Sequence, residues 1–165
     1  MADYTHIQRT FGPVYDENSR ILILGSFPSV KSREANFYYG HPQNRFWPLL
    51  SRLLECDVPE SIEEKKTLLL SNNIALWDTL DSCDIIGSSD SSIRNAVPTD
   101  VMQILDAADI KKIFCNGGTS YTLFLRYLTP VCGITPVKLP STSPANASWN
   151  MERLYTEWIR IKEFL

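Results

Sequence analysis

Aromatic, amide and hydroxyl side chains crowd residues 21–47, which read ILILGSFPSVKSREANFYYGHPQNRFW. Three adjacent aromatics, Phe37 to Tyr39, cannot all face the same side, so we expect at least one of them to border a cleft and stack on a flat ligand. Asn44 can hold a water molecule or hydrogen-bond to the edge of such a ligand, although asparagine is also a favoured helix cap. His41 suits either burial with both ring nitrogens bonded or a catalytic role. These residue types predict a pocket for a flat ring.

A proline-containing turn, Ser26-Phe27-Pro28-Ser29, comes directly after the apolar run. A tight turn of this kind points successive backbone N–H groups into the cleft, and the proline fixes its geometry. The same residues also suit a stiff connection between a strand and a helix. Lys31, two positions further on, is the nearby cation that a phosphate group can contact.

A second rigid polar turn, LPSTSPANA, occupies residues 139–147. It places three hydroxyl side chains and an amide around two prolines, and this combination suits contacts with the phosphates that position a nucleic-acid backbone. A polar turn without function is the alternative. The residues concerned are Ser141, Thr142, Ser143, Pro144, Ala145 and Asn146.

Four short apolar segments must position these turns, and we expect strands at residues 20–25, 73–78, 111–116 and 136–139. Helical spacing predicts helices near residues 46–54, 62–69, 100–108, 118–128 and 149–165, with Thr99 or Asp100 capping the third. Near-continuous apolar strands that alternate with helices are typical of a mostly parallel sheet covered on both faces. We therefore predict one α/β domain over residues 1–165, a three-layer α/β/α sandwich around a central, mostly parallel four-stranded sheet.

In such a sheet the ligand site lies beyond the carboxyl ends of the strands, where both polar turns are expected. Residues 79–98 read as a long connection rich in serine and aspartate. The length of that connection indicates a functional or mobile loop.

The composition excludes several classes of protein. Sixteen Lys and Arg against nineteen Asp and Glu give a formal net charge of −3, so any polyanion must be held locally. The four cysteines form no C-x-x-C pair, and we expect buried free thiols in a reducing, intracellular compartment. The sequence contains no signal-peptide core, membrane-length apolar run, P-loop, G-x-G-x-x-G, G-x-S-x-G or zinc-deaminase pattern.

Together, the two polar turns resemble motifs of the uracil-DNA glycosylase superfamily, most closely its hypoxanthine-DNA (deoxyinosine) glycosylase branch. GSFPS is similar to the first motif of the superfamily, and FYYGHPQNRFW to the segment that follows it. LPSTSPANA resembles the second motif, which in relatives grips DNA beside a flipped nucleotide. ALWD at residues 75–78 and GSSDSSIRNAVPTD at residues 87–100 also resemble the hypoxanthine branch.

Two positions depart from the pattern of the superfamily. Phe27 stands where relatives carry an Asn that positions the attacking water, with an Asp nearby in other branches, so the usual catalytic side chain is missing. In the hypoxanthine branch this role is thought to pass to an Asn further along the motif, and the matching residue here is Asn44. Ser141 stands where the most active uracil enzymes carry a histidine that stabilises the departing base.

The resemblance implies a monofunctional DNA glycosylase that hydrolyses the N-glycosidic bond of a flipped, deaminated base, with hypoxanthine in deoxyinosine expected first. This reaction needs a positioned water and no metal or other cofactor. Its partner would be double-stranded DNA containing a damaged base, bound by a monomer in the cytoplasm, without any membrane. The resemblance assigns catalysis to Asn44, base binding to Ser26, Phe27, Tyr39 and His41, and DNA binding to Pro28, Ser29, Lys31 and residues 141–146.

Other functions remain open at this point. A catalytically weak or inactive module that binds DNA lesions fits the loss of the usual side chain at Phe27. A uracil-specific or mismatch-specific glycosylase fits the same motifs. An enzyme that acts on free nucleosides or nucleotides is a further alternative, and it predicts weak dependence on salt.

Overall fold

The computed structural model describes residues 3–27, 30–87 and 89–165. At its centre lies a sheet of four parallel strands in the order β3-β2-β6-β7. The strands are β2 (Ile21–Gly25), β3 (Ile74–Asp78), β6 (Lys112–Asn116) and β7 (Val137–Leu139). Each begins one residue later than the sequence predicts and ends where it predicts. β2 and β3 are buried throughout, which explains their continuous apolar sequence.

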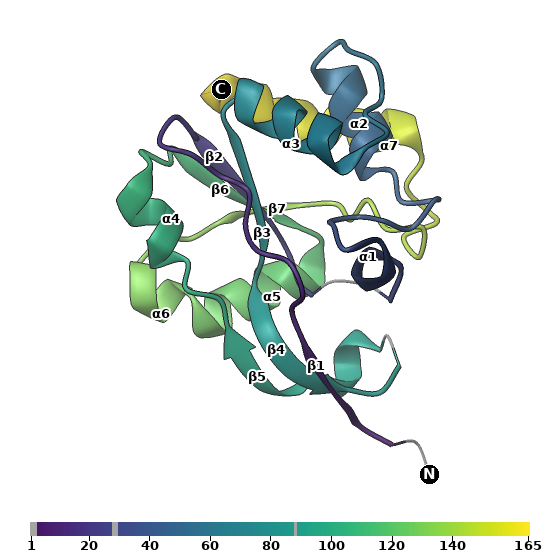
Figure 1. Cartoon of the computed structure of the whole chain (residues 1–165), viewed down its shortest axis with the longest axis vertical. Coiled ribbons are helices and arrows are strands. Elements are labelled where there is room, and N and C mark those ends of the chain that lie inside the picture. The colour runs from purple at the N-terminus through teal and green to yellow at the C-terminus, as the bar shows by residue number, and fades with distance from the viewer. Residues whose placement is uncertain (1–2, 28–29, 88) are drawn as a thin grey trace.

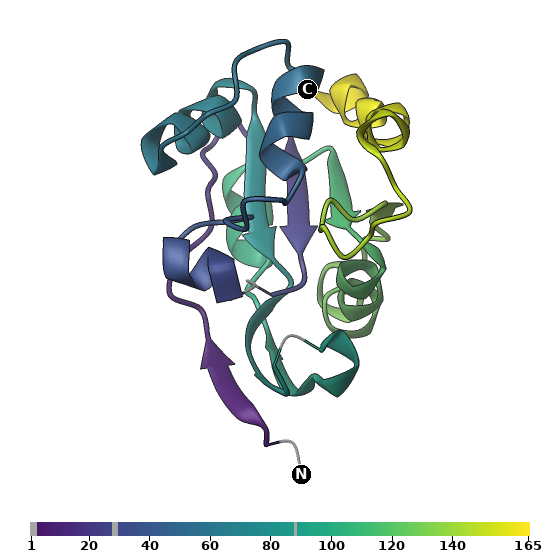
Figure 2. The same cartoon turned by 90° about the vertical axis from the view of Figure 1, so that its right-hand side faces the viewer.

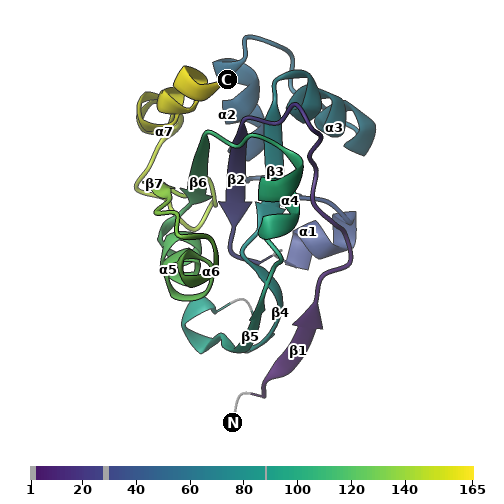
Figure 3. The same cartoon turned by 90° about the vertical axis from the view of Figure 1, so that its left-hand side faces the viewer.

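Helices cover both faces of this sheet (Figure 1). The chain leaves β2 through α1 (Val30–Ala35). One face is covered by α2 (Phe46–Leu53), α3 (Ile62–Ser71) and α7 (Met151–Trp158), which the 3-10 helix η2 (Ile159–Phe164) continues. The other face is covered by α4 (Met102–Ala107), α5 (Gly118–Tyr127) and α6 (Thr129–Cys132), which lie toward the viewer in Figure 3. The predicted three-layer sandwich is therefore confirmed.

A second sheet replaces the long loop that the sequence suggested for residues 79–98. It is antiparallel, has the order β1-β4-β5 and contains β1 (Thr5–Gln8), β4 (Leu80–Ile85) and β5 (Arg94–Pro98), with a 3-10 turn, η1 (Asp90–Ser92), between the last two. The prediction was wrong because β4 lacks a regular alternation of buried and exposed residues: Leu80, Cys83 and Ile85 are buried, while two aspartates between them are only partly buried. Figure 2 shows that β2 and β3 run toward this second sheet.

Buried hydroxyl groups fix the backbone where the strands end. The Thr79 hydroxyl donates to the carbonyl of Gly25 over 2.9 Å, and Ser120 donates to the carbonyl of Leu24 over 2.7 Å. Thr99 donates to the carbonyl of Asp78 over 2.9 Å. Thr99 therefore ties the exit of β3 and does not cap α4, which begins with no side-chain cap. The Gly25 carbonyl also accepts the backbone N–H of Thr79 over 2.7 Å, so the hydroxyl groups add to the backbone bonds that hold the strand ends.

The main core packs both faces of the central sheet against the helices. Ile23, Leu24 and Phe114 from the sheet are completely buried, as is Leu154 from α7. Among the described residues, no helix combines the length and the apolar character needed to cross a membrane. The four cysteines are free thiols, but the prediction that they are buried is wrong for Cys56, which is exposed, while Cys132 is partly buried.

Replacing Ile23 with alanine should lower the free energy of unfolding by about 2–5 kcal/mol, because the substitution leaves a cavity in the middle of the sheet. Urea denaturation followed by circular dichroism measures this loss. Val131→Ala on α6 is the control, because Val131 is 64% exposed, and its change should stay within about 0.5 kcal/mol. Equal losses for the two variants would contradict this description of the core.

Candidate functional site

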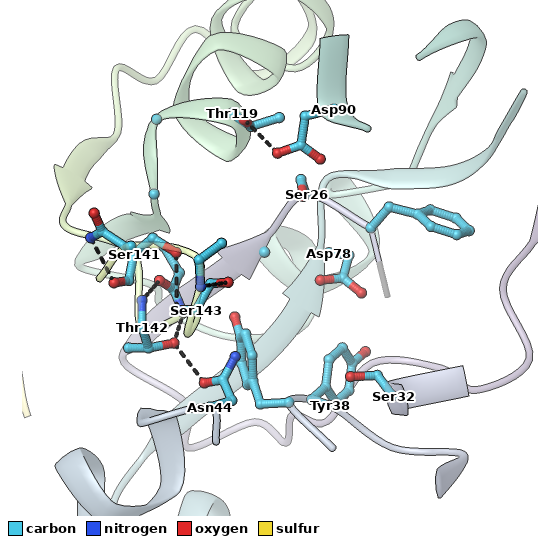
Figure 4. Close-up of a pocket in the computed structure, with 18 of the residues that line it drawn as sticks. Ser26, Ser32, Tyr38, Asn44, Asp78, Asp90, Thr119, Ser141, Thr142 and Ser143 are labelled. Carbon is cyan, nitrogen blue, oxygen red and sulfur yellow. Dashed lines mark hydrogen bonds between the residues drawn. The ribbon is translucent and has the colours of Figure 1, made fainter. Parts of the chain in front are cut away.

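A cavity of about 750 Å³ opens at the carboxyl edge of the central sheet. The last residues of its four strands, Gly25, Asp78, Asn116 and Leu139, all line it. This volume falls within the range of small-molecule sites, about 300–1,000 Å³. Both polar turns contribute to the wall (Figure 4). The predicted residues that line the cavity are Ser26, Phe27, Tyr39, Asn44, Ser141, Thr142, Ser143, Ala145 and Asn146.

Asn44 presents a hydrogen-bond donor to this cavity. Its side-chain oxygen accepts the backbone N–H of Phe46 over 2.9 Å and the hydroxyl of Thr142 over 2.9 Å. A carbonyl oxygen has two lone pairs, so these two donors occupy it fully and fix the orientation of the amide. The side-chain nitrogen has no partner among the described residues. Asn44, one residue before the N-cap Arg45, thus satisfies the N–H of the first residue of α2 and also offers an N–H₂ group to a ligand.

Arg45 holds the second polar turn against the start of α2. Its guanidinium group donates to the carbonyl oxygens of Ser143 over 2.8 Å and Asn146 over 3.1 Å, and also to that of Trp149. Its backbone N–H donates to the carbonyl of Thr142 over 3.0 Å. One side chain from the start of α2 therefore sets the path of residues 142–149.

Thr142 joins that turn to the end of β6. Its hydroxyl accepts the side-chain amide of Asn116 over 3.0 Å, and its backbone N–H donates to the oxygen of the same amide over 3.1 Å. Thr142 is completely buried, so its predicted contact with DNA is corrected. It positions Asn44 and Asn116 instead.

The turn organises its own hydroxyl groups. The Ser141 hydroxyl oxygen accepts the backbone N–H of Ser143 over 3.1 Å, and the Ser143 hydroxyl oxygen accepts that of Ala145 over 3.2 Å. The Asn146 amide donates to the carbonyl of Ser141 over 3.0 Å. Because each hydroxyl oxygen already accepts a bond, its hydrogen remains available for an acceptor at the cavity mouth. Ala145 is exposed there.

Tyr39 forms an aromatic wall of the cavity. Its ring stacks on Phe46 with the ring centroids 4.2 Å apart, and its backbone has a positive φ of 54°. Positive φ is unusual for a bulky residue, and such strain often accompanies functional sites. The Tyr39 hydroxyl is buried and has no hydrogen-bond partner among the described residues. Burial, followed by the proximity of Asp78, raises the pKa of this phenol, which keeps it neutral.

A buried ion pair closes the floor of the cavity. Arg9 donates to the Oδ2 oxygen of Asp78 over 2.5 Å and to the hydroxyl of Tyr38 over 2.8 Å. The side chains of Arg9 and Asp78 are only 4% and 5% exposed. Burial raises the pKa of the Asp78 carboxyl, and the Arg9 guanidinium opposes that rise. The cation keeps a carboxylate in a place where an isolated charge would be costly.

Other predicted residues are not among those that line the cavity. His41 accepts the backbone N–H of Gln43 on its Nδ1 atom over 3.0 Å, within the turn that leads to α2. Lys31 is exposed and pairs with Glu34 over 3.3 Å. Pro144 lies in the turn without lining the cavity. Pro28 and Ser29 fall outside the described residues.

The sequence did not assign several residues of the site, among them Arg9, Arg45, Asp78 and Asn116. Asp78 and Asn116 end two predicted strands, so their place at the carboxyl edge was a usable signal. No sequence feature marks Arg9 and Arg45, because each donates hydrogen bonds to residues that are distant in the sequence.

The site contains donors, a carboxylate and an aromatic wall. Within residues 3–27, 30–87 and 89–165, no group of three or more His, Cys, Asp or Glu side chains could hold a metal ion. The cavity thus matches what binding a flat, polar ring requires, namely stacking along one face and hydrogen bonds at the edge.

Comparison with known families identifies this arrangement. The family model described as the uracil DNA glycosylase superfamily matches residues 13–162. The chain belongs to the uracil DNA glycosylase superfamily. The family resemblance that the sequence motifs indicate is therefore confirmed, and the match includes both polar turns and all four strands of the central sheet.

Curated members of the superfamily are similar over much or most of the chain. A protein from Methanosarcina acetivorans named hypoxanthine DNA glycosylase is 35% identical over 156 residues, which cover 92% of this chain and 96% of that protein. One of the same name from Methanosarcina barkeri is 38% identical over 113 residues, 67% of this chain and 71% of that protein. A solution structure of a candidate uracil DNA glycosylase from Methanosarcina acetivorans superposes with a TM-score of 0.82 at 31% identity, covering 97% and 99% of the two chains.

Replacing Arg45 with alanine should release residues 142–149 and make them sensitive to limited proteolysis, because several carbonyl groups lose their donor at once. The free energy of unfolding should fall by about 1–3 kcal/mol, as expected when carbonyl groups lose hydrogen bonds from a charged donor. Mass spectrometry of the proteolytic fragments and urea denaturation measure the two effects.

Arg52→Ala is the matched control, because Arg52 also lies on α2 but forms an exposed ion pair with Glu152. Its loss should cost at most about 1 kcal/mol. If residues 142–149 of the Arg45→Ala variant are cleaved no faster than in the wild-type protein, this turn keeps its conformation without the hydrogen bonds from Arg45.

Proposed function

We propose that this protein is a DNA glycosylase that hydrolyses the N-glycosidic bond of a deaminated base flipped out of a duplex, with hypoxanthine in deoxyinosine as the preferred substrate. The DNA glycosylase activity is supported by the curated relatives that cover most of the chain. The choice of hypoxanthine is also supported by their name, because each is called a hypoxanthine DNA glycosylase.

The observation that carries the proposal is the fixed orientation of Asn44. Its oxygen is occupied, so it faces the cavity as a donor. When the bond between C1′ and the base nitrogen breaks, the electron pair leaves with the base, which becomes an anion. A preorganised donor lowers the energy of that developing charge. Water then supplies hydroxide to C1′ of the sugar, and its proton neutralises the base, so the overall reaction is a hydrolysis.

The remaining features of the cavity serve binding. One face of the Tyr39 ring stacks on Phe46. A purine that stacks on the opposite face gains about 1–3 kcal/mol of binding free energy. The hydroxyl hydrogens of Ser141 and Ser143 are free to donate to phosphates that flank the flipped nucleotide. The protein acts, in this proposal, as a single domain and as a monomer on double-stranded DNA in the cytoplasm, without any cofactor.

Ala145 occupies the exposed mouth of the cavity, where the resemblance implies a larger wedge in relatives. A methyl group cannot replace a base in the stack. Extrusion therefore depends on pairs that open easily, as deaminated and mismatched bases do.

The direct test uses duplexes that contain one deoxyinosine, one deoxyuridine or only normal bases. We expect release of free hypoxanthine from the first duplex, followed by strand cleavage when alkali is added at the abasic site. Binding should weaken steeply as salt rises, because the protein contacts phosphates. Absence of any abasic site at stoichiometric enzyme, with every deaminated base, would refute the proposal.

Substitutions at Asn44 separate catalysis from helix capping. Asn44→Asp keeps an oxygen for Phe46 and Thr142 but removes the donor, whereas Asn44→Ala removes both. Single-turnover excision should fall by about 10²–10³-fold in both variants, the usual effect of losing one transition-state donor. Only the alanine variant should lose about 0.5–2 kcal/mol of stability, the usual effect of losing a cap. An Asn44→Asp variant with wild-type excision would restrict Asn44 to its capping role.

One observation favours a second function, that of a lesion-binding module without catalysis. Phe27 lines the cavity at the place where relatives carry the side chain that positions water. This function predicts selective affinity for duplexes with deoxyinosine and no release of the base, an outcome that the same assay distinguishes.

A further inference from the structure

The wall of the cavity has an apolar part that the proposed mechanism does not use. Ile7, Phe27, Ile85 and Ile93 line the cavity, and all four belong to or pack against the small hydrophobic core of the second sheet. Arg33, in the last turn of α1, lines the cavity as well. A cation therefore lies on a wall that is otherwise apolar.

The guanidinium group of Arg33 has no anionic partner. Its side chain forms no ion pair or hydrogen bond with any described residue, and its Nε atom is buried without an acceptor. Two carboxylates occur among the described residues that line the cavity, but Asp78 pairs with Arg9, and Asp90 accepts the hydroxyl of Thr119 over 3.0 Å. Because a buried donor without an acceptor costs free energy, the cation is set up to receive an acceptor from outside the protein.

The surroundings of Arg33 strengthen its charge. Burial, and then the proximity of Asp84, raise the pKa of the Cys83 thiol, and Arg33 opposes that rise. The guanidinium group therefore lies within electrostatic reach of Cys83, which is buried in the core of the second sheet. Apolar neighbours lower the local dielectric constant, so an anion that reaches Arg33 is bound more strongly there than on an exposed surface.

The helix that carries Arg33 lies across the cavity from the second polar turn. In Figure 4, Ser32 of α1 stands on the side of the cavity opposite Ser141 and Ser143. In the proposed function, the hydroxyl groups of these two serines donate to phosphates of the damaged strand. A strand carries a phosphate on each side of every nucleotide. A nucleotide seated between the turn and α1 therefore has a phosphate available on the α1 side.

The chemistry of arginine fits such a phosphate. Its planar group can form two parallel, charge-assisted hydrogen bonds to two phosphate oxygens. Lys31, which the resemblance assigned to DNA binding, lies on the same helix but is exposed and already paired with Glu34 over 3.3 Å. Of these two cations of α1, Arg33 is the one that lines the cavity and lacks a partner.

We propose that Arg33 forms a phosphate-binding site, which holds one backbone phosphate next to the flipped nucleotide on the side opposite Ser141 and Ser143. This inference rests on the proposed glycosylase function and adds a charged contact with DNA to it. The site holds the strand at the cavity and does not touch the base or the bond that breaks.

The first test measures how the affinity for DNA depends on salt in the Arg33→Gln variant. Fluorescence anisotropy is recorded with a duplex that carries a non-hydrolysable analogue of deoxyinosine. The slope of log K against log salt concentration should fall by about 0.9, the value for one phosphate. Affinity at low salt should fall at least about tenfold. The melting temperature should not fall, because Arg33 has no partner to lose in the free protein.

Two control variants accompany this test. Lys31→Gln removes a positive charge from the same helix and should leave the slope unchanged, because Lys31 does not line the cavity. Arg33→Lys keeps the charge and should keep the slope, but its affinity should stay below that of the wild type, because an ammonium group cannot form the two parallel bonds. If Arg33→Gln does not fold, Arg33→Met replaces it, since methionine keeps an unbranched apolar stem.

The second test identifies the phosphate. Neutral methylphosphonate linkages replace single phosphates, one at a time, on both sides of the analogue. At one position the substitution should weaken binding of the wild-type protein at least about tenfold, and it should cost the Arg33→Gln variant little, because the charged partner is already absent. This non-additivity is the signature of a direct contact.

The outcomes separate this inference from the proposed function. A wild-type slope in the Arg33→Gln variant overturns the phosphate site, as do methylphosphonates that cost both proteins the same at every position. If the wild-type protein releases no hypoxanthine while one phosphate is still coupled to Arg33, the proposed function fails and the phosphate site stands.

Discussion

The guanidinium group of Arg45 is the interaction on which the architecture of the site depends. It lies at the start of α2 and satisfies carbonyl groups of the turn at residues 142–149, which is distant in the sequence. Through that turn it places Thr142, whose hydroxyl fixes Asn44 and whose backbone fixes Asn116. The bonds form one connected network, so the orientation of the Asn44 amide depends on the contacts that the next residue, Arg45, makes with the turn. Preorganisation of this kind is what electrostatic catalysis requires.

Charge is distributed in the site in a way that suits a neutral ligand. The ion pair of Arg9 and Asp78 brings no net charge to the floor, and the aromatic wall adds none. Donors remain at Asn44 and at the mouth, where the turn hydroxyls face outward. In the proposed reaction a flat base therefore needs no counter-charge to enter, and the anion that forms when the base departs meets the donor at Asn44. The protein carries a net charge of −3, so its hold on DNA must come from this local arrangement rather than from bulk attraction.

The central sheet was predictable because strands buried on both faces have a continuous apolar sequence that few other elements share. The second sheet was not, since β4 mixes buried Leu80 and Cys83 with aspartates that are typical of loops. In the site, the aromatic wall and the amide were visible as unusual residue types near one strand exit. Arg9 and Asp78 are 69 positions apart in the sequence. A local sequence pattern cannot predict a contact between residues so far apart. Buried cations in particular look like ordinary surface residues until the fold shows their partners.

The central claim is that a flipped base lies against Tyr39, within reach of the Asn44 amide. The most direct measurement is a structure of the protein bound to a duplex that carries a non-hydrolysable analogue of deoxyinosine. Our account predicts the extruded base in the cavity at the carboxyl ends of the strands, stacked on Tyr39, with Asn44 donating to it and the turn at residues 141–146 against the flanking phosphates. A complex in which the base stays stacked in the duplex and the cavity faces away from the DNA would contradict it.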